Sequence, residues 1–173
     1  VKSVAKGGGT VIDIVAGVAA AHHAFAVSSG VVYFVDPFGF IKRYDPNVGV
    51  VATMSSVPVS AYGLLVVEPS VYWTNDTGPP SLAGIYSLPV SAVSATPSFV
   101  PISGMPPHVM GTDGALLFAG TAAEIQKYTL PIVTSPTFFS ASSDTKLQLA
   151  TDNVRVYWLD LLAGSYRILR VPK

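Results

Sequence analysis

The sequence predicts an all-β fold, a β-propeller-like array of about four four-stranded antiparallel blades. First, half of the residues are hydrophobic and only 12% are charged, a composition that excludes a disordered chain. Second, 15 glycines and 14 prolines are spread along the chain at loop spacing, and no stretch forms a convincing amphipathic helix. Third, two strand markers recur about every 42 residues, which is the period of propeller blades.

The first marker is an apolar strand that contains an aromatic residue. It reads VVYFVD at 31–36, VYWTND at 71–76, GALLFAG at 114–120 and VRVYWLD at 154–160. We take Phe34, Trp73, Phe118 and Trp158 as the equivalent positions. Another apolar strand precedes each marker across a turn, such as Asp113-Gly114, whose residues tolerate the positive φ of a hairpin. These segments are strands one and two of each unit.

The second marker is a strand that begins with isoleucine and follows the first. It reads IKRY from Ile41, IYSL from Ile85, IQKY from Ile125 and ILRV from Ile168, and VKSV from Val1 has the same pattern. A weaker strand follows at 10–15, 49–54, 98–102 and 137–140. Each unit therefore contains four strands. The Ala-rich stretch 15–24 is interpreted as a strand end and connector.

The repeats predict a single propeller domain over residues 1–173, with approximate units 1–43, 44–87, 88–128 and 129–173. The chain opens and closes on a third strand, so the last unit lacks a fourth strand. Residues 10–15 would supply it if the ring closes within one chain. Alternatively, two chains complete a larger ring, or the sequence is part of a longer propeller.

Composition and charge exclude several classes of function. Ten basic and ten acidic residues, unclustered, argue against a nucleic-acid partner. No apolar run is long enough to span a membrane. The absence of cysteine excludes disulfides and thiolate metal sites. No phosphate loop or catalytic motif occurs, so we predict no cofactor. Low charge with abundant serine and threonine favours an extracellular, periplasmic or cell-surface location.

Two groups of residues are candidate binding residues. His22 and His23, with His108 about two repeats later, could bind a metal or an anion at one ring face. The commoner role of such histidines is as connector residues satisfied by water or backbone. Asp36, Asp76 and Asp160 end the second strand of their units, so they could form a ring of acids that binds cations or sugars. The structural alternative is that each accepts backbone N–H groups in its turn.

The strands VYWTND and VYWLD, each followed by a third strand ending near VP or LP, resemble the YWTD-type β-propeller repeat of low-density-lipoprotein-receptor-like proteins. The segments VKSVAKGGG and ILRVPK are similar to those of bacterial surface propellers. The resemblance implies that the aromatic residue packs between blades and that the acid fixes the loop. Asp36, Asp76 and Asp160 match the acid position, whereas Gly120 does not.

We therefore expect a non-catalytic binding or interaction scaffold, an exported bacterial protein that binds a protein or carbohydrate ligand through loops of one ring face. Phe38, Phe40 and Tyr62 are the aromatic residues at or near loops. One alternative is an enzyme, a lyase or hydrolase with polar groups at the axial channel. Another is a structural repeat module that assembles with copies of itself into a homo-oligomer.

Overall fold

The computed structural model describes most of the chain. The described residues are 2–3, 7–10, 12–13, 25–59, 61–75, 83–102, 107, 109–121, 124–130, 137–140, 145–162 and 164–173. Within these ranges the secondary structure consists of strands and turns. A search of the same residues for a helix long and apolar enough to cross a membrane finds none.

The first two blades are four-stranded antiparallel sheets whose strands follow in chain order. Blade 1 consists of β3 (Phe25–Ser28), β4 (Val31–Val35), β5 (Ile41–Asp45) and β6 (Val50–Thr53). Blade 2 consists of β7 (Ala61–Val67), β8 (Ser70–Asn75), β9 (Gly84–Pro89) and β10 (Ser98–Pro101). The predicted order of four strands per unit is confirmed in both.

Blade 3 repeats this arrangement, and blade 4 has three strands among the described residues. Blade 3 consists of β11 (Val109–Thr112), β12 (Leu116–Gly120), β13 (Glu124–Thr129) and β14 (Thr137–Ser140). Blade 4 consists of β15 (Thr145–Thr151), β16 (Arg155–Leu162) and β17 (Ser165–Pro172). The molecule is thus an all-β, propeller-like array, as the sequence predicts.

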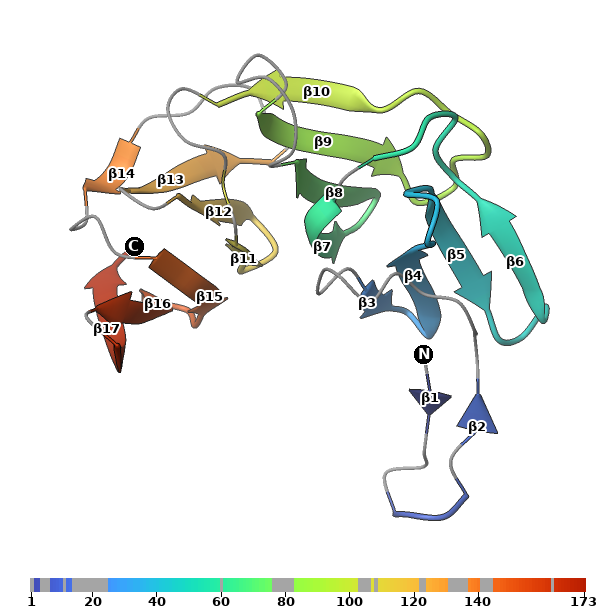
Figure 1. The fold of residues 1–173 in the computed structure, drawn as a ribbon, viewed down its shortest axis with the longest axis horizontal. Coiled ribbons are helices and arrows are strands. Elements are labelled where there is room, and N and C mark those ends of the chain that lie inside the picture. Colours follow the sequence, from blue (N-terminus) through green and yellow to red (C-terminus); the bar gives the residue numbers. More distant parts are fainter. Residues whose placement is uncertain are drawn as a thin grey trace.

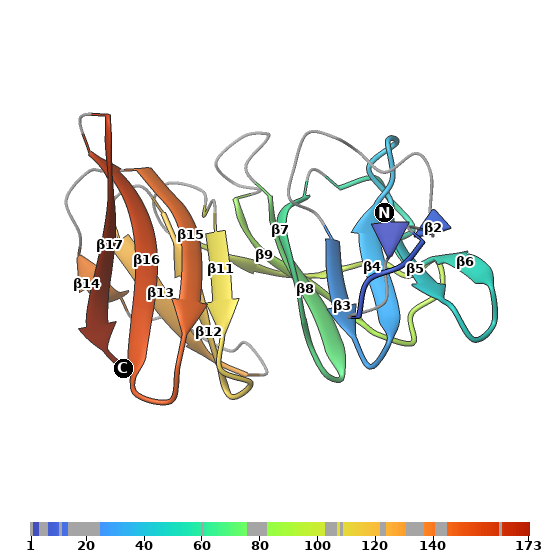
Figure 2. The same cartoon turned by 90° about the horizontal axis from the view of Figure 1, so that it is seen from below.

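The blades form an arc that is open on one side (Figure 1). The first strands of successive blades lie side by side, β3 with β7, β7 with β11 and β11 with β15. The view from below shows the same order, with β15 and β3 at opposite ends of the row (Figure 2). The arc places the turns between strands one and two of all four blades on one face.

The residues proposed to close the ring pair elsewhere. Strand β2 (Ile12–Asp13), within the segment 10–15, pairs with β1 (Lys2–Ser3) and not with blade 4. The intervening Gly8 and Gly9 have φ of 87° and 128°, which favours glycine in the turn. A pairing partner ten residues away costs far less loop-closure entropy than one at the far end of the chain. Among the described residues, no strand pairs with the outer edge of β17.

Strand register corrects one equivalence drawn from the sequence. The residue after the marker isoleucine pairs with the aromatic residue in three blades: Lys42 with Phe34, Tyr86 with Trp73 and Leu169 with Trp158. In blade 3 the corresponding Gln126 pairs with Ala119, not with Phe118. A shift of one residue turns a side chain to the other face of the sheet. Trp73 accordingly packs towards the preceding blade, whereas Phe118 packs towards blade 4.

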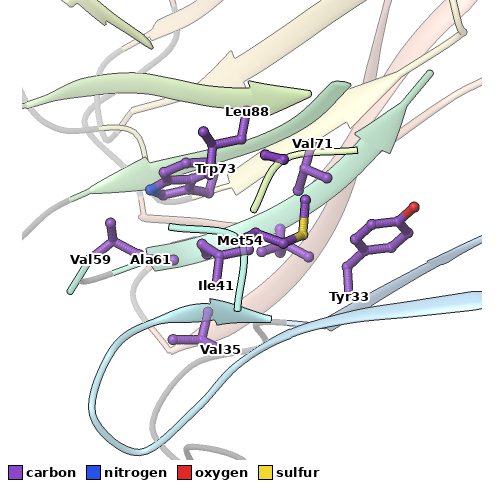
Figure 3. Close-up of a cluster of buried hydrophobic side chains, with 11 residues drawn as sticks. Tyr33, Val35, Ile41, Met54, Val59, Ala61, Val71, Trp73 and Leu88 are labelled. Carbon is purple, nitrogen blue, oxygen red and sulfur yellow. The ribbon is translucent and has the colours of Figure 1, made fainter. Parts of the chain in front are cut away.

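The core of the described residues consists of three clusters, one between each pair of neighbouring blades. Between blades 1 and 2, Ile41 and Met54 pack against Trp73 (Figure 3). Ile85 packs against Leu117 between blades 2 and 3, and Ile125 packs against Trp158 between blades 3 and 4. Full burial of one such side chain contributes about 1.5–3 kcal/mol. The third-strand isoleucine therefore joins each blade to the next one.

Candidate functional site

A cleft of about 340 Å³ lies between blades 1 and 2. Its residues come from β4, β5, β6 and the turn after β5 in blade 1, and from Val90 and Ser91, which follow β9 in blade 2. The valines Val31, Val48 and Val50 contribute apolar surface, and Tyr33, Arg43 and Asp45 contribute polar groups. A concave site with mainly apolar walls and a few polar groups is the usual form of a small-molecule site.

Strand register brings the polar groups together. Tyr33 pairs with Arg43 across β4 and β5, and Arg43 pairs with Ala52 across β5 and β6. Directly opposed residues share a face of the sheet, so this row lies on the face of blade 1 that meets blade 2. The Arg43 guanidinium donates from Nη1 to the Val90 carbonyl oxygen at 2.6 Å, which fixes the blade 2 wall against blade 1.

The Tyr33 hydroxyl is one polar group that the cleft leaves available. Tyr33 is only 4% exposed, and its hydroxyl has no hydrogen-bond partner among the described residues. Burial raises the pKa of Tyr33, and the Glu68 carboxylate raises it further while Arg43 lowers it. The phenol is therefore neutral at physiological pH and can both donate and accept a hydrogen bond.

Asp45 supports one wall of the cleft. Its Oδ1 accepts a hydrogen bond from the Asn47 backbone N–H at 2.8 Å, which fixes the turn that carries Val48. Val48 is 67% exposed at this turn. The cleft therefore offers apolar surface, the Tyr33 phenol, and the Arg43 cation near the Asp45 anion. Such a combination is suited to binding a small molecule.

Asp36 lies in the turn after β4, and backbone groups of the same turn bind its side chain. The side chain accepts backbone N–H groups from Phe38 and Phe40 at 2.9 Å each, and its Oδ2 lies 2.9 Å from the Lys42 ammonium. Burial raises the pKa of Asp36, but Lys42 and the two backbone donors outweigh this and hold it below its usual value. Phe38 is 79% exposed at the tip of the same turn.

Asp160 occupies the position in blade 4 that Asp36 occupies in blade 1. It is 1% exposed, and its Oδ2 accepts a hydrogen bond from Arg167 at 2.9 Å. In blade 3 the same position is Thr121, whose hydroxyl accepts the Glu124 backbone N–H at 3.0 Å. Asp36 and Asp160 lie in blades at opposite ends of the arc, so the structure does not bring them together.

Four of the predicted site residues are outside the described residues. These are His22, His23, His108 and Asp76. In blade 2 the register places Asn75 at the position of Asp36, because each lies two residues after the aromatic residue of its second strand. Within the described part of the chain, no group of three or more His, Cys, Asp or Glu side chains could hold a metal ion.

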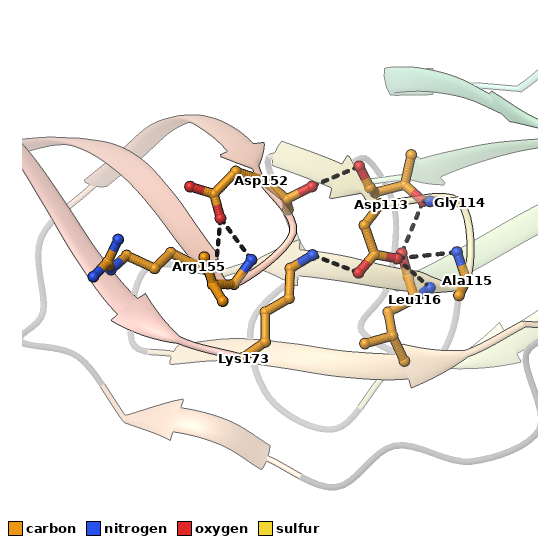
Figure 4. Close-up of polar contacts among 10 residues, drawn as sticks. Asp113, Gly114, Ala115, Leu116, Asp152, Arg155 and Lys173 are labelled. Carbon is orange, nitrogen blue, oxygen red and sulfur yellow. Dashed lines mark hydrogen bonds and ion pairs between the residues drawn. The ribbon is translucent and has the colours of Figure 1, made fainter.

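Polar contacts also join the turns of blades 3 and 4 (Figure 4). The Asp113 carboxylate accepts the backbone N–H groups of Ala115 and Leu116 at 3.0 and 2.8 Å, and its Oδ2 lies 2.5 Å from the Lys173 ammonium. Burial raises the pKa of Asp113, but these partners outweigh it and lower the pKa to about 2. Thr151 adds a bond from its hydroxyl to the Thr112 carbonyl at 2.7 Å. These contacts hold the turns of blades 3 and 4 in place. The sequence predicts turns at these positions from hairpin residues such as Asp113-Gly114.

The cleft was not predicted from the sequence. Tyr33 belongs to the VVYFVD strand and Arg43 to the IKRY strand, so each was assigned to the repeat pattern. The available signal was the pairing of a tyrosine and an arginine across two consecutive strands. Val90 joins them from the next blade, which no local pattern shows.

No protein-family model and no curated protein sequence matches the chain. Among solved structures, it is similar to a catalytically inactive variant of virginiamycin B lyase from Staphylococcus aureus, solved with quinupristin. The identity is 12%, the TM-score is 0.70, and the match covers 98% of this chain and 61% of the lyase.

Two computationally designed proteins are also similar to the chain. For Ika4 the identity is 13%, the TM-score is 0.59, and the match covers 87% of this chain and 93% of that chain. For Ika8 the identity is 14% and the TM-score is 0.62, over 84% of this chain and 44% of that chain. The chain thus spans less than two thirds of the length of both Ika8 and the lyase. These likenesses show the β-propeller fold.

Proposed function

We propose that the chain is a non-catalytic binding scaffold of the β-propeller type and that the cleft between blades 1 and 2 holds its ligand. The observation that carries this proposal is the Tyr33 hydroxyl, which lines a cleft of about 340 Å³ and has no hydrogen-bond partner among the described residues. The hydroxyl opens into the cleft, so a ligand hydroxyl or carbonyl can form the hydrogen bond that water would otherwise make there.

The ligand class that fits the cleft is a neutral carbohydrate. Arg43 and Asp45 carry opposite charges on the same strand, so their charges offset each other and favour an uncharged ligand. The valine walls and the tyrosine ring provide apolar surface for the C–H face of a sugar. The volume lies within the usual range for small-molecule sites.

The repeat type and the location belong to the same proposal. The strands VYWTND and VYWLD support a YWTD-like propeller repeat, and the low charge supports an exported bacterial protein. The alternative of an enzyme depends on His22, His23 and His108, which lie outside the described residues, so it stays a prediction.

A glycoside titration tests the proposal. A panel of methyl glycosides is added to isotope-labelled protein, and backbone amide shifts are followed by NMR. We expect saturable shifts at Val31, Val48 and Ser91 for at least one glycoside. Tyr33→Phe should weaken its binding about 3- to 10-fold, because one hydrogen bond contributes about 0.5–1.5 kcal/mol.

Tyr44→Phe is the matched control. Tyr44 lies next to Arg43 on β5 and so projects from the other face of the sheet, away from the cleft. Binding should be unchanged in this variant. The proposal fails if no glycoside shifts the cleft amides, or if both variants weaken binding equally.

A further inference from the structure

The charged groups of the cleft between blades 1 and 2 do not pair directly with each other. Arg43 and Asp45 are two residues apart on β5 and both line the cleft, so their backbones are about 7 Å apart on one face of the sheet. Among the described residues, the Arg43 guanidinium forms a hydrogen bond to the Val90 carbonyl oxygen and no ion pair. Its remaining N–H groups can therefore donate to a ligand.

Arg43 by itself would make the cleft a site for acidic ligands. A guanidinium presents N–H donors that match the two oxygens of a carboxylate, and such charge-assisted hydrogen bonds are stronger than neutral ones. The apolar walls formed by Val31 and Val50 lower the local dielectric constant, which strengthens the attraction. A cleft that binds a neutral ligand therefore needs a feature that disfavours the acidic analogue.

Asp45 is one such feature. Its Oδ1 accepts the Asn47 backbone N–H at 2.8 Å, and its Oδ2 has no partner among the described residues. The turn thus fixes a carboxylate in the cleft wall with one oxygen available. A ligand carboxylate that reached Arg43 would be repelled by this fixed anion, whereas a ligand hydroxyl could donate to it.

Glu68 places a second carboxylate beside the cleft. It lies in the exposed turn between β7 and β8 of blade 2. The hydroxyls of Ser28 and Ser29 in blade 1 donate to its Oε1 at 3.1 and 2.9 Å, which fixes the side chain against blade 1. Ser28 pairs with Val31, and Val31 lines the cleft. The Glu68 carboxylate is therefore held at the rim.

The Tyr33 hydroxyl responds to all three charges. Burial is the largest cause of its raised pKa. The Glu68 carboxylate raises the pKa next, Arg43 lowers it, and Asp45 raises it to a smaller extent. Two carboxylates and one guanidinium thus surround the group that would bind the ligand, and they leave this part of the cleft with a net negative charge.

We propose that Asp45 and Glu68 determine the charge class of the ligand: the cleft binds neutral glycosides in preference to uronic acids and other sugars that carry a carboxylate. This inference rests on the proposed function, because it concerns the same cleft. Asp45 acts from the cleft wall and Glu68 from the exposed rim. Asp45 has the larger effect, because solvent and salt screen an exposed charge more strongly.

Pairs of glycosides that differ in charge test the proposal. Methyl glucoside is compared with methyl glucuronide, and methyl galactoside with methyl galacturonide, by NMR titration. The measured quantity is the ratio of the two affinities within a pair. At low ionic strength we expect the neutral member to bind the native protein about 10-fold more tightly. The ratio should fall as salt is added, because salt screens the repulsion.

Variants assign the preference to particular residues. Asp45→Asn should lower the ratio about 10-fold and Glu68→Gln about 2- to 3-fold. The amide of Asp45→Asn keeps an Oδ1 acceptor for the Asn47 N–H, so the turn is retained. Asp152→Asn is the matched control: it removes the same charge from the turn between β15 and β16, and the ratio should be unchanged. Tyr33→Phe should weaken both members of a pair equally.

The outcomes distinguish this inference from the proposed function. If no neutral glycoside binds the native protein, both are wrong. If a neutral glycoside binds but its acidic partner binds as tightly, the role of the two carboxylates is overturned while the binding cleft stands. An unchanged ratio in Asp45→Asn would have the same meaning. An equal change in Asp152→Asn would also overturn the inference, because net charge and not position would then be responsible.

Discussion

Blades 2 and 4 carry the same isoleucine in two different environments. Ile85 is 1% exposed beneath blade 3, whereas Ile168 is 77% exposed on the last blade. Both side chains face away from the preceding blade. Each isoleucine pairs with the residue that directly follows the tryptophan in the second strand of its blade. The comparison teaches that burial in a repeat array is a property of the neighbouring repeat. A sequence pattern can therefore repeat faithfully while its contribution to stability does not.

The position before the isoleucine also differs between blades 2 and 4. Gly84 in blade 2 and Arg167 in blade 4 are equivalent, since they pair with Asn75 and Asp160. A Cβ on Gly84 would lie 2.3 Å from the Val100 carbonyl oxygen of β10. Blade 4 has no described strand at that place, and an arginine side chain occupies the position. The close approach of β10 thus requires glycine in blade 2, whereas the four-stranded blades 1 and 3 carry Phe40 and Glu124 at this position.

The largest expected effect separates the two isoleucines. Ile85→Ala should lower the free energy of unfolding by about 2–5 kcal/mol, because it leaves a cavity between blades 2 and 3. Ile168→Ala should change it by about 0.5 kcal/mol or less, as at most exposed positions. Urea unfolding of both variants at low protein concentration measures the difference. Equal losses would contradict the assignment of Ile168 to an open face.

The next effect concerns Gly84. Gly84→Ala should destabilise the protein by about 1–3 kcal/mol, because the added methyl group overlaps the β10 backbone and Phe99. Gly63→Ala is the control in the same blade, since its nearest contact would be Met110 Cε at an ordinary 3.7 Å. Thermal unfolding compares the two. A stable Gly84→Ala variant would show that β10 does not lie where the structure places it.

A comparable or smaller effect concerns the turn of blade 1. Asp36→Ala should cost about 2 kcal/mol, because two backbone N–H groups and Lys42 lose their acceptor. Thr121→Ala removes the equivalent group in blade 3 and should cost about 1 kcal/mol, because a neutral hydroxyl binds more weakly than a carboxylate. Urea unfolding measures both. A larger loss of stability for Thr121→Ala than for Asp36→Ala would indicate that desolvation of the Asp36 carboxylate outweighs its contacts.

The smallest effect is a pH dependence at the junction of blades 3 and 4. The pKa of Asp113 is lowered from 3.8 to about 2 in the folded chain, so the unfolded chain binds the proton more readily. The stabilisation is present above pH 4 and is lost as the pH falls towards 2. Asp113→Asn should therefore reduce the slope of stability against pH in that window and cost about 1 kcal/mol or less at neutral pH. An unchanged slope would contradict the role of Lys173.

The fold followed from the sequence because its signals are local. The isoleucine of each third strand and the turn residues such as Asp113-Gly114 mark strands wherever they occur. Where two markers disagreed, the choice was wrong: the aromatic Phe118 was taken as equivalent to Trp73, although register assigns Ala119. An aromatic residue can face either neighbouring blade, so its presence alone does not fix the register.

The candidate site was harder to predict because it combines residues from two blades. Tyr33 and Val90 are far apart in the sequence and meet only when blade 2 packs on blade 1. Asp36 was identified as either a ligand or a turn residue, and the structure shows its turn contacts. Nothing in the sequence of ILRV distinguishes Ile168 from its buried equivalents, since the difference depends on the absence of a described neighbouring blade.

The most direct measurement is the thiol-labelling rate of Ile168→Cys and Ile85→Cys at several protein concentrations. The chain has no other cysteine, so each rate reports one position. We predict that Ile85→Cys reacts slowly at every concentration, because blade 3 covers it. Ile168→Cys should react rapidly at every concentration, because no described blade covers it. An Ile168→Cys variant that is as slow as Ile85→Cys even when dilute would contradict the open face of blade 4.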